Sequence, residues 1–199
     1  MGKRLIAIMT AIAALFSCHT SKTVAADGPD KNQKEMKLND IINEGRIDLM
    51  TYEHNDGSIP ADIRRGYSIR VYTDSVKVHI WSWHSDDVDI TKVYPASPDT
   101  LQHLLESLQR LDVRKVEPDP NVMTVPGTGG SDGYMSAWAG EECLFSAGAY
   151  FCHGLYGNLQ MNSNYEGDVV SLFHRCVPDD VYQMVEESRL PREIRERGR

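Results

Sequence analysis

Three short segments carry residue types that could bind an anion, bind a cation or attack a carbonyl group. The first, residues 127–133, reads Gly-Thr-Gly-Gly-Ser-Asp-Gly and is rich enough in glycine to approach a phosphate closely. Phosphate loops of the Walker and dinucleotide types open a helix, and the Walker type needs a lysine. This run has no lysine and leads into a predicted strand, so a flexible approach to a hairpin is the better interpretation.

The second segment is Cys152-His153, a thiol beside an imidazole. Adjacent residues on an extended strand point to opposite faces, so His153 is poorly placed to deprotonate Cys152. A catalytic base would have to come from elsewhere, such as His174 or His79, and the sequence places neither beside the thiol. A disulfide is therefore the favoured role of Cys152.

The third segment holds Asp86, Asp87 and Asp89 between two predicted strands. A calcium loop normally adds a glycine at its sharp turn and a bidentate glutamate, and this run has neither. The seven histidines are scattered and no Cys-x-x-Cys motif occurs, so the sequence predicts no metal site. It also contains no recognised hydrolase motif. We therefore predict no cofactor and no catalytic residue, and favour a binding protein over an enzyme.

The elements that would position these residues follow from the spacing of apolar side chains. Helical spacing predicts helices over residues 36–44, 101–111 and 169–177, with a continuation after Pro178. Alternating residues of β type predict strands or hairpins over residues 47–52, 66–80, 88–94, 113–117, 133–147 and 155–161. This order predicts an α+β fold, in which helices pack on one face of an antiparallel sheet and the other face can remain in water.

A shift of the sequence by 67 residues aligns Gly66-Tyr67 with Gly133-Tyr134 and brings a helix, a long loop and a hairpin of each half into step. Identity between the halves is low, so chance stays open beside a tandem duplication of a helix plus four-strand unit. The duplication would divide a single domain, residues 36–188, into repeats 36–102 and 103–177.

The first predicted hairpin can be interpreted residue by residue. A turn at Asp74-Ser75 would send one set of mostly β-branched and aromatic residues to the core, in the pairs Thr73–Val76, Val71–Val78, Ile69–Ile80 and Tyr67–Ser82. The opposite face then carries Ser68, Arg70, Tyr72, Lys77, His79, Trp81 and Trp83. In the second hairpin, the equivalent face is expected to be small and smooth, with Met135, Ala137, Ala139, Leu144, Ser146 and Gly148.

Two interpretations of the tryptophan-rich face stay open. A loop such as residues 117–132 could fold over it and make a second small core. Alternatively, the face is a recognition surface, because Trp, Tyr and Arg concentrate binding energy at interfaces. On this second interpretation the predicted binding residues are Trp81, Trp83, Tyr72, Arg70 and His79.

The N-terminus has the features of an export signal. Lys3-Arg4 precede an apolar core at residues 5–16, which is too short for a bilayer span of roughly 20 residues. The following Leu15-Phe16-Ser17-Cys18 resembles the lipobox of bacterial lipoproteins, although Phe16 is bulkier than the residue usual there. The resemblance implies that Cys18 is lipidated and becomes the first mature residue.

Ordinary secretion, with cleavage after Ala26, is the competing interpretation of this segment. Lipidation is favoured because Cys18 directly follows the apolar core. The chain would then consist of a signal peptide at 1–17, a lipidated cysteine and flexible tether at 18–35, the α+β domain and a charged tail at 189–199. It would be anchored to a bacterial membrane, in the periplasm or on the cell surface.

With Cys18 lipidated, three cysteines remain for an oxidising compartment. The predicted disulfide joins Cys152 to Cys176, because a bulge at Gly148 would turn Cys152 towards the third helix. Without that bulge, a Cys143 to Cys176 bond would be favoured.

Composition narrows the class of partner. The chain of 199 residues has 21 Lys+Arg against 29 Asp+Glu, a net charge of −8, and 41% hydrophobic residues. The ordinary apolar content excludes a disordered or multi-span membrane protein. The absence of a basic run argues against nucleic acid as partner. We therefore expect a protein partner, most plausibly a basic enzyme or toxin that the chain blocks as an inhibitor or immunity factor.

The expected architecture is similar to that of β-lactamase inhibitory proteins, which pair duplicated helix-and-sheet units and bind through an aromatic sheet face. This similarity of fold, without a shared motif, implies an inhibitor. Two alternatives stay open: a carbohydrate- or peptide-binding envelope lipoprotein, since Trp and Tyr also stack on sugar rings, and a hydrolase that uses Cys152 or the His79/His84 region.

Overall fold

The computed structural model describes residues 37–57, 59–84, 86–115, 131–148, 159–160, 167–191 and 194–195. The chain divides into two units, Met1–Lys34 and Glu35–Arg199, and every described residue belongs to the second. The predicted signal peptide and tether, with Cys18, fall outside the described residues, as do Cys152 and residues 117–130 of the proposed covering loop. No described helix has the length and apolar character of a membrane span.

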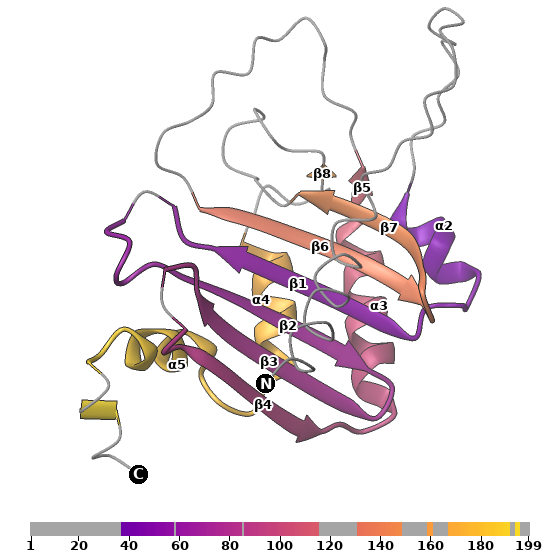
Figure 1. Ribbon diagram of the computed structural model, residues 1–199. Helices are drawn as coiled ribbons and strands as arrows, with labels where there is room; N and C mark the ends of the chain where they lie inside the picture. Colours follow the sequence, from indigo (N-terminus) through magenta and orange to yellow (C-terminus); the bar gives the residue numbers. More distant parts are fainter. Residues whose placement is uncertain are drawn as a thin grey trace, which may run out of the picture. The chain divides into compact units, whose positions relative to one another are not determined.

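Six strands form one antiparallel sheet in the order β4-β3-β2-β1-β6-β7 (Figure 1). Their bounds are β1 Leu49–Asn55, β2 Arg65–Tyr72, β3 Ser75–Ser82, β4 Asp89–Pro95, β6 Asp132–Ala139 and β7 Glu142–Gly148. The short strands β5 (Arg114–Lys115) and β8 (Leu159–Gln160) pair separately. Strand β1 pairs with both β2 and β6, so it joins the two hairpins into one sheet.

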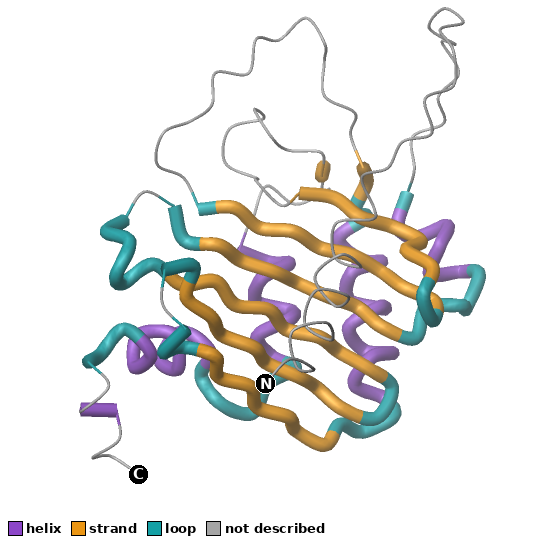
Figure 2. The backbone as a smooth tube through the Cα atoms, viewed as in Figure 1, coloured by secondary structure: helices purple, strands orange, loops and turns teal. Residues whose placement is uncertain are grey.

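The helices pack on one face of this sheet, which confirms the α+β prediction (Figure 2). Helix α3, Asp99–Leu111, begins after Pro98 and buries Leu101, Leu104, Leu105 and Leu108, whose spacing forms a single stripe. Helix α4, Gly167–Arg175, adds Val169, Leu172 and Phe173 to the same core. The remaining described helices are α2, Leu38–Asn43, and α5, Val181–Ser188.

The first hairpin turns one residue earlier than predicted, at Thr73-Asp74. Val71 therefore pairs with Val76 and Ile69 with Val78, instead of the predicted Val78 and Ile80. Moving the turn by one residue changes the pairing by two, and side chains alternate with a period of two, so each residue keeps its face. Six of the eight residues expected in the core are buried: Tyr67, Ile69, Val71, Val76, Val78 and Ile80. The other two are not, because Thr73 lies in the turn and is exposed, and Ser82 at the end of β3 is half-buried.

The second hairpin forms where predicted. Its expected outer face is wrong for β6, whose Met135 and Ala137 point to the core, and right for Ser146 and Gly148 of β7, which lie opposite the outward Ser136 and Tyr134. Met135 and Ala137 are fully buried and face the core opposite Ala147 and Phe145. Polar atoms account for the orientation: Met135, Ala137, Phe145 and Ala147 carry none that form strong hydrogen bonds, whereas the opposite orientation would bury the hydroxyls of Tyr134 and Ser136 and the indole N–H of Trp138. The pairing is regular as far as Gly148, the last described residue of β7, so the bulge expected there stays a prediction; within the described part the irregularity lies between Ala137 and Trp138.

The shift of 67 residues aligns residues that face opposite ways in β2 and β6, although it aligns core residues with each other in β3 and β7, such as Val78 with Phe145. Tyr67 is buried against the helices, whereas its counterpart Tyr134 is 48% exposed. The tandem duplication stays a prediction.

Helix α5 is held at both ends by side-chain hydrogen bonds. Asp180 Oδ1 accepts from the backbone nitrogens of Tyr182 and Gln183 at 2.9 and 3.2 Å. At the other end, the buried Arg65 of β2 donates to the backbone oxygen of Ser188 at 2.9 Å and to its hydroxyl at 3.2 Å. The strand thereby satisfies a carbonyl at the end of α5 that has no partner within the helix.

Candidate functional site

The sheet face that points away from α3 and α4 is the candidate site, and we call it the outer face. Its residues follow from the strand registers and from the alternation of side chains along each strand. They are Leu49, Thr51, Glu53 and Asn55 of β1, Ser68, Arg70 and Tyr72 of β2, Lys77, His79 and Trp81 of β3, Asp89, Thr91 and Val93 of β4, and Tyr134, Ser136 and Trp138 of β6.

Three of the five predicted binding residues lie together at one end of the outer face. The ring centroids of Trp81 and Trp83 are 6.3 Å apart in an edge-to-face arrangement, and those of His79 and Trp81 are 5.1 Å apart. Trp83 follows β3 and is 56% exposed. We call the group of Trp81, Trp83, His79 and the nearby Asp86, Asp87 and Asp89 the tryptophan corner.

The indole of Trp81 packs on the backbone of Gly66. Gly66 lies on the neighbouring strand β2 and is the direct pairing partner of Trp81. A Cβ atom at position 66 would lie 2.4 Å from Cε2 of Trp81. Only glycine allows the indole to approach the sheet this closely.

A hydrogen-bonded pair, His79 and Asp89, borders the same group. His79 Nε2 lies 2.8 Å from Asp89 Oδ1, and the side chain of Asp89 is 77% exposed. Asp86 and Asp87 are exposed on the turn that joins β3 to β4. The tryptophan corner thus combines indole rings with carboxylates.

The other two predicted residues, Arg70 and Tyr72, lie towards the opposite end of the outer face. Arg70 pairs with Lys77, four residues before Trp81 on β3 and so about 13 Å from it. One end of the face therefore carries three carboxylates, and the other carries two basic side chains with the single carboxylate of Asp74 in the β2–β3 turn, which accepts from Ser75 Oγ.

Sequence reasoning missed two aromatic residues of the outer face, Tyr134 and Trp138. Trp138 Nε1 donates to Ser136 Oγ at 2.9 Å, and Ser136 Oγ lies 2.5 Å from Thr51 Oγ1 of β1. The pairing of β6 with β1 brings both aromatic residues to this face. The local sequence signal that could have placed them there is the alternation along the strand, in which Tyr134, Ser136 and Trp138 share one face and Met135 and Ala137 share the other.

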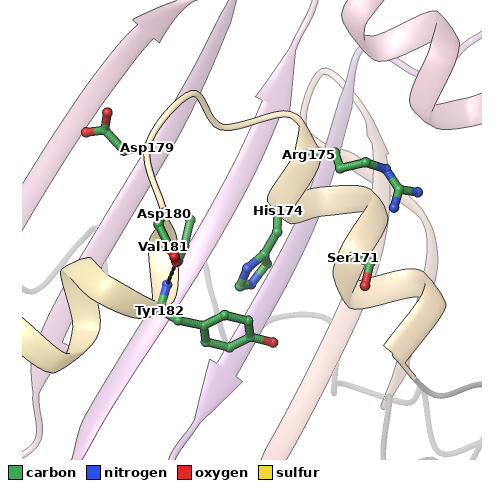
Figure 3. A pocket seen from close by; sticks show the side chains of 7 residues that line it. All are labelled: Ser171, His174, Arg175, Asp179, Asp180, Val181 and Tyr182. Atoms are coloured by element: carbon green, nitrogen blue, oxygen red, sulfur yellow. Dashed lines mark hydrogen bonds between the residues drawn. The ribbon is translucent and has the colours of Figure 1, made fainter.

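A second group of polar residues lies on the helical side of the sheet. Tyr67 Oη of β2 and His174 Nε2 of α4 share a hydrogen bond at 3.0 Å, and Tyr182 of α5 stacks 4.4 Å from the His174 ring. His174 and Tyr182 border an open cavity of about 400 Å³. In Figure 3, His174 points towards Tyr182, whereas Arg175 and Asp179 point away from it.

The protonation states of this group favour a structural role. Burial lowers the pKa of His174 to about 4 and raises the pKa of Tyr67, so both side chains are neutral near pH 7. Burial also raises the pKa of Cys176 to about 11, which keeps that thiol protonated. Nothing in this arrangement supplies an activated nucleophile, and the hydrolase alternative gains no support from it.

Of the three cysteines considered for the predicted disulfide, the structure describes Cys143 and Cys176. Cys143 Sγ donates to the carbonyl of Phe145 at 3.6 Å and Cys176 Sγ donates to that of Leu172 at 3.4 Å, and the two sulfurs are not bonded to each other. Because Cys152 lies outside the described residues, its bond to Cys176 stays a prediction.

Among the described residues, no three His, Cys, Asp or Glu side chains come together as ligands for a metal ion. Comparison with known proteins adds no family: no protein-family model, no curated protein and no solved structure matches the chain.

Proposed function

We propose that this chain is an exported, lipid-anchored binding protein that recognises another protein through the outer face of its sheet and acts as an inhibitor or immunity factor. The observation that carries the proposal is that Trp81, Trp83, Tyr134 and Trp138 all lie on the face opposite α3 and α4, with Trp81 and Trp83 in contact at one end and Trp138 at the other. A sheet face without a covering helix usually carries polar side chains. Tyr and Trp there fit an interface, because they offer large contact area with few rotamers to immobilise.

Net charge supports a basic partner. The whole chain carries −8, and removing residues 1–17 would take away Lys3 and Arg4 but no acidic residue, which leaves −10. Such a charge attracts a cationic protein over long distances and speeds its encounter with the binding face.

The test uses the products of the genes beside this one, because an inhibitor or immunity factor is expected to be encoded next to its target. Binding of each purified product is measured by calorimetry, with the wild-type chain and with Trp81→Ala. We expect one product to bind and Trp81→Ala to weaken its binding by about tenfold or more, since truncating a central interface Trp costs about 2 kcal/mol.

Tyr182→Ala is the matched control, because Tyr182 is 58% exposed, close to the 56% of Trp83, but lies on α5. Ile69→Ala, in the core, should instead destabilise the fold. If no neighbouring product binds, or if Trp81→Ala unfolds the chain while residual binding is unchanged, the proposal is wrong. Loss of oligosaccharide binding in Trp81→Ala, with no protein partner, would favour the carbohydrate-binding alternative.

Anchoring is tested separately. Mass spectrometry of the membrane fraction should show a diacylglyceryl group on an N-terminal Cys18, as the lipobox resemblance implies. A mature chain that begins at Asp27 would instead support cleavage after Ala26.

A further inference from the structure

We infer that the tryptophan corner is the part of the outer face that receives a cationic side chain, arginine or lysine, from the partner. This inference rests on the proposed function and names the chemistry of one contact within it.

The aromatic part of the tryptophan corner suits a cation. The indole of Trp81 lies so close to Gly66 that a Cβ atom at position 66 would clash with its ring. The ring of Trp83 packs edge-to-face against the indole of Trp81. With Trp83 56% exposed, an indole surface is open to a partner. A guanidinium or ammonium group is attracted to the face of an indole, which is the strongest aromatic partner for cations.

The carboxylates add a full negative charge at the same place. The Asp89 side chain bonds His79 through Oδ1 but is 77% exposed, and a carboxylate has acceptor sites for further hydrogen bonds. Asp86 and Asp87 lie on the adjoining turn. An arginine that stacks on the indoles could therefore also donate to a carboxylate, a pairing that its planar, delocalised cation favours.

The chain itself already places one guanidinium at this turn. Arg195 Nη2 donates to the backbone carbonyl of Asp87 at 3.3 Å. The contact is exposed and uses a carbonyl rather than a carboxylate, so it shows that a guanidinium can reach this turn. Of the Asp89 carboxylate, Oδ1 is bonded to His79.

The opposite end of the outer face would repel the same group. Arg70 and Lys77 lie side by side on β2 and β3, about 13 Å from Trp81. The charge of the outer face therefore changes along its strands, from acidic at the tryptophan corner to basic at Arg70 and Lys77. A cation of the partner is attracted to the tryptophan corner rather than to the end that holds Tyr72 and Trp138.

The experiment uses the full chain labelled with nitrogen-15 and a tetra-arginine peptide as the probe. The three tryptophans give three indole N–H signals, which the variants Trp81→Phe, Trp83→Phe and Trp138→Phe assign. We expect the peptide to shift the signals of Trp81 and Trp83 and to leave that of Trp138 in place. Because Trp138 lies on the same face at the basic end, it is an internal control for binding elsewhere on the sheet.

Charge variants test the carboxylates. The triple variant Asp86→Asn, Asp87→Asn and Asp89→Asn should weaken the peptide by about tenfold or more, and added salt should do the same. The control removes three carboxylates on the helices, the exposed Asp40 and Asp99 and the half-buried Glu106, by Asp40→Asn, Asp99→Asn and Glu106→Gln, and changes the net charge equally. It should leave the affinity within about twofold, because screened charges far from the site contribute little.

Three outcomes would overturn the inference: no indole signal shifts with tetra-arginine, only Trp138 shifts, or both triple variants weaken binding equally. A neutral tetrasaccharide that shifts Trp81 and Trp83 while tetra-arginine does not would also overturn it. None of these outcomes bears on whether a partner protein depends on Trp81, which the calorimetry above measures, so the two proposals can fail independently.

Discussion

The position of Trp81 depends on a single small residue, Gly66. Because Gly66 has no side chain, the indole of Trp81 packs directly on β2, and Trp83 and His79 then pack on the indole. The arrangement of the tryptophan corner therefore depends on one missing methyl group.

Gly66→Ala should displace the indole of Trp81, because the new Cβ would lie 2.4 Å from its ring. We expect the Trp81 indole N–H signal to shift, the Trp138 signal to stay, and the free energy of unfolding to fall by about 1 to 3 kcal/mol, as for overpacking elsewhere. Ser68→Ala, on the same strand and face, is the control and should leave both signals unchanged. An unmoved Trp81 signal in Gly66→Ala would show that the indole does not rest on this glycine.

His174 should make stability depend on pH. Burial is the main cause that lowers its pKa to about 4 from the ordinary 6.5; His54 lowers it further and Asp180 opposes the shift. Between these values the unfolded chain binds a proton that the folded chain rejects, so the free energy of unfolding should fall as pH drops from about 6.5 to about 4. Below about pH 4 this group should contribute no further loss.

Urea denaturation at intervals across this range measures the effect. His174→Gln keeps a hydrogen-bonding partner for Tyr67 but cannot titrate, so its stability should depend less on pH there. His103→Gln, on an exposed position of α3, should keep the wild-type dependence. Equal slopes in the wild type and His174→Gln would contradict the assignment.

Among the elements, helix α5 depends most clearly on bonds at its two ends. Its eight residues are too few for an isolated helix to be stable in water, so its caps and its apolar stripe must hold it. Asp180 satisfies two backbone nitrogens at its start, and Arg65 satisfies the carbonyl of Ser188 at its end.

Asp180→Ala should lower the free energy of unfolding by about 1 kcal/mol, the usual cost of losing an N-cap. Asp180→Ser should recover most of this loss, because a serine hydroxyl can accept the same hydrogen bond. Chemical denaturation compares the three chains. If Asp180→Ser is as destabilised as Asp180→Ala, the charge of Asp180 rather than its capping bond stabilises the helix.

At the scale of the whole molecule, a covalent link is predicted between the helical layer and a segment beyond β7. A Cys152–Cys176 disulfide would stabilise the fold by about 2 to 4 kcal/mol, chiefly by restricting the unfolded chain. The half-buried Cys176 thiol, whose pKa burial raises to about 11, would react slowly unless α4 opens or the bond forms during folding.

Peptide mapping of the exported protein without reductant should yield Cys152 joined to Cys176. Cys152→Ser and Cys176→Ser should each lower the unfolding free energy in oxidising buffer, and the difference from the wild type should shrink with reductant. A peptide that joins Cys143 to Cys176 would contradict the prediction, as would a wild-type chain indifferent to reductant.

Much of this architecture could be predicted from local patterns. The leucine stripe of α3 and the alternation of Ile69, Val71, Val76 and Val78 each specify an element and its buried side. Even a misplaced turn left the faces of the first hairpin correct, because the error changed the pairing by two residues. Trp81 and Trp83 were therefore placed on the outer face before any tertiary contact was known.

The tertiary structure alone decided what lies beside them. The pairing of β1 with β6 joins residues far apart in the sequence, such as Thr51 and Ser136, which are 85 positions apart, and it brings Tyr134 and Trp138 to the same face. The contact between Tyr67 and His174 spans 107 positions in the same way. Such contacts leave no periodic signal in the sequence, because their partners are chosen by competition among all apolar surfaces for burial, whereas the direction of a side chain along a strand or helix follows from local backbone geometry.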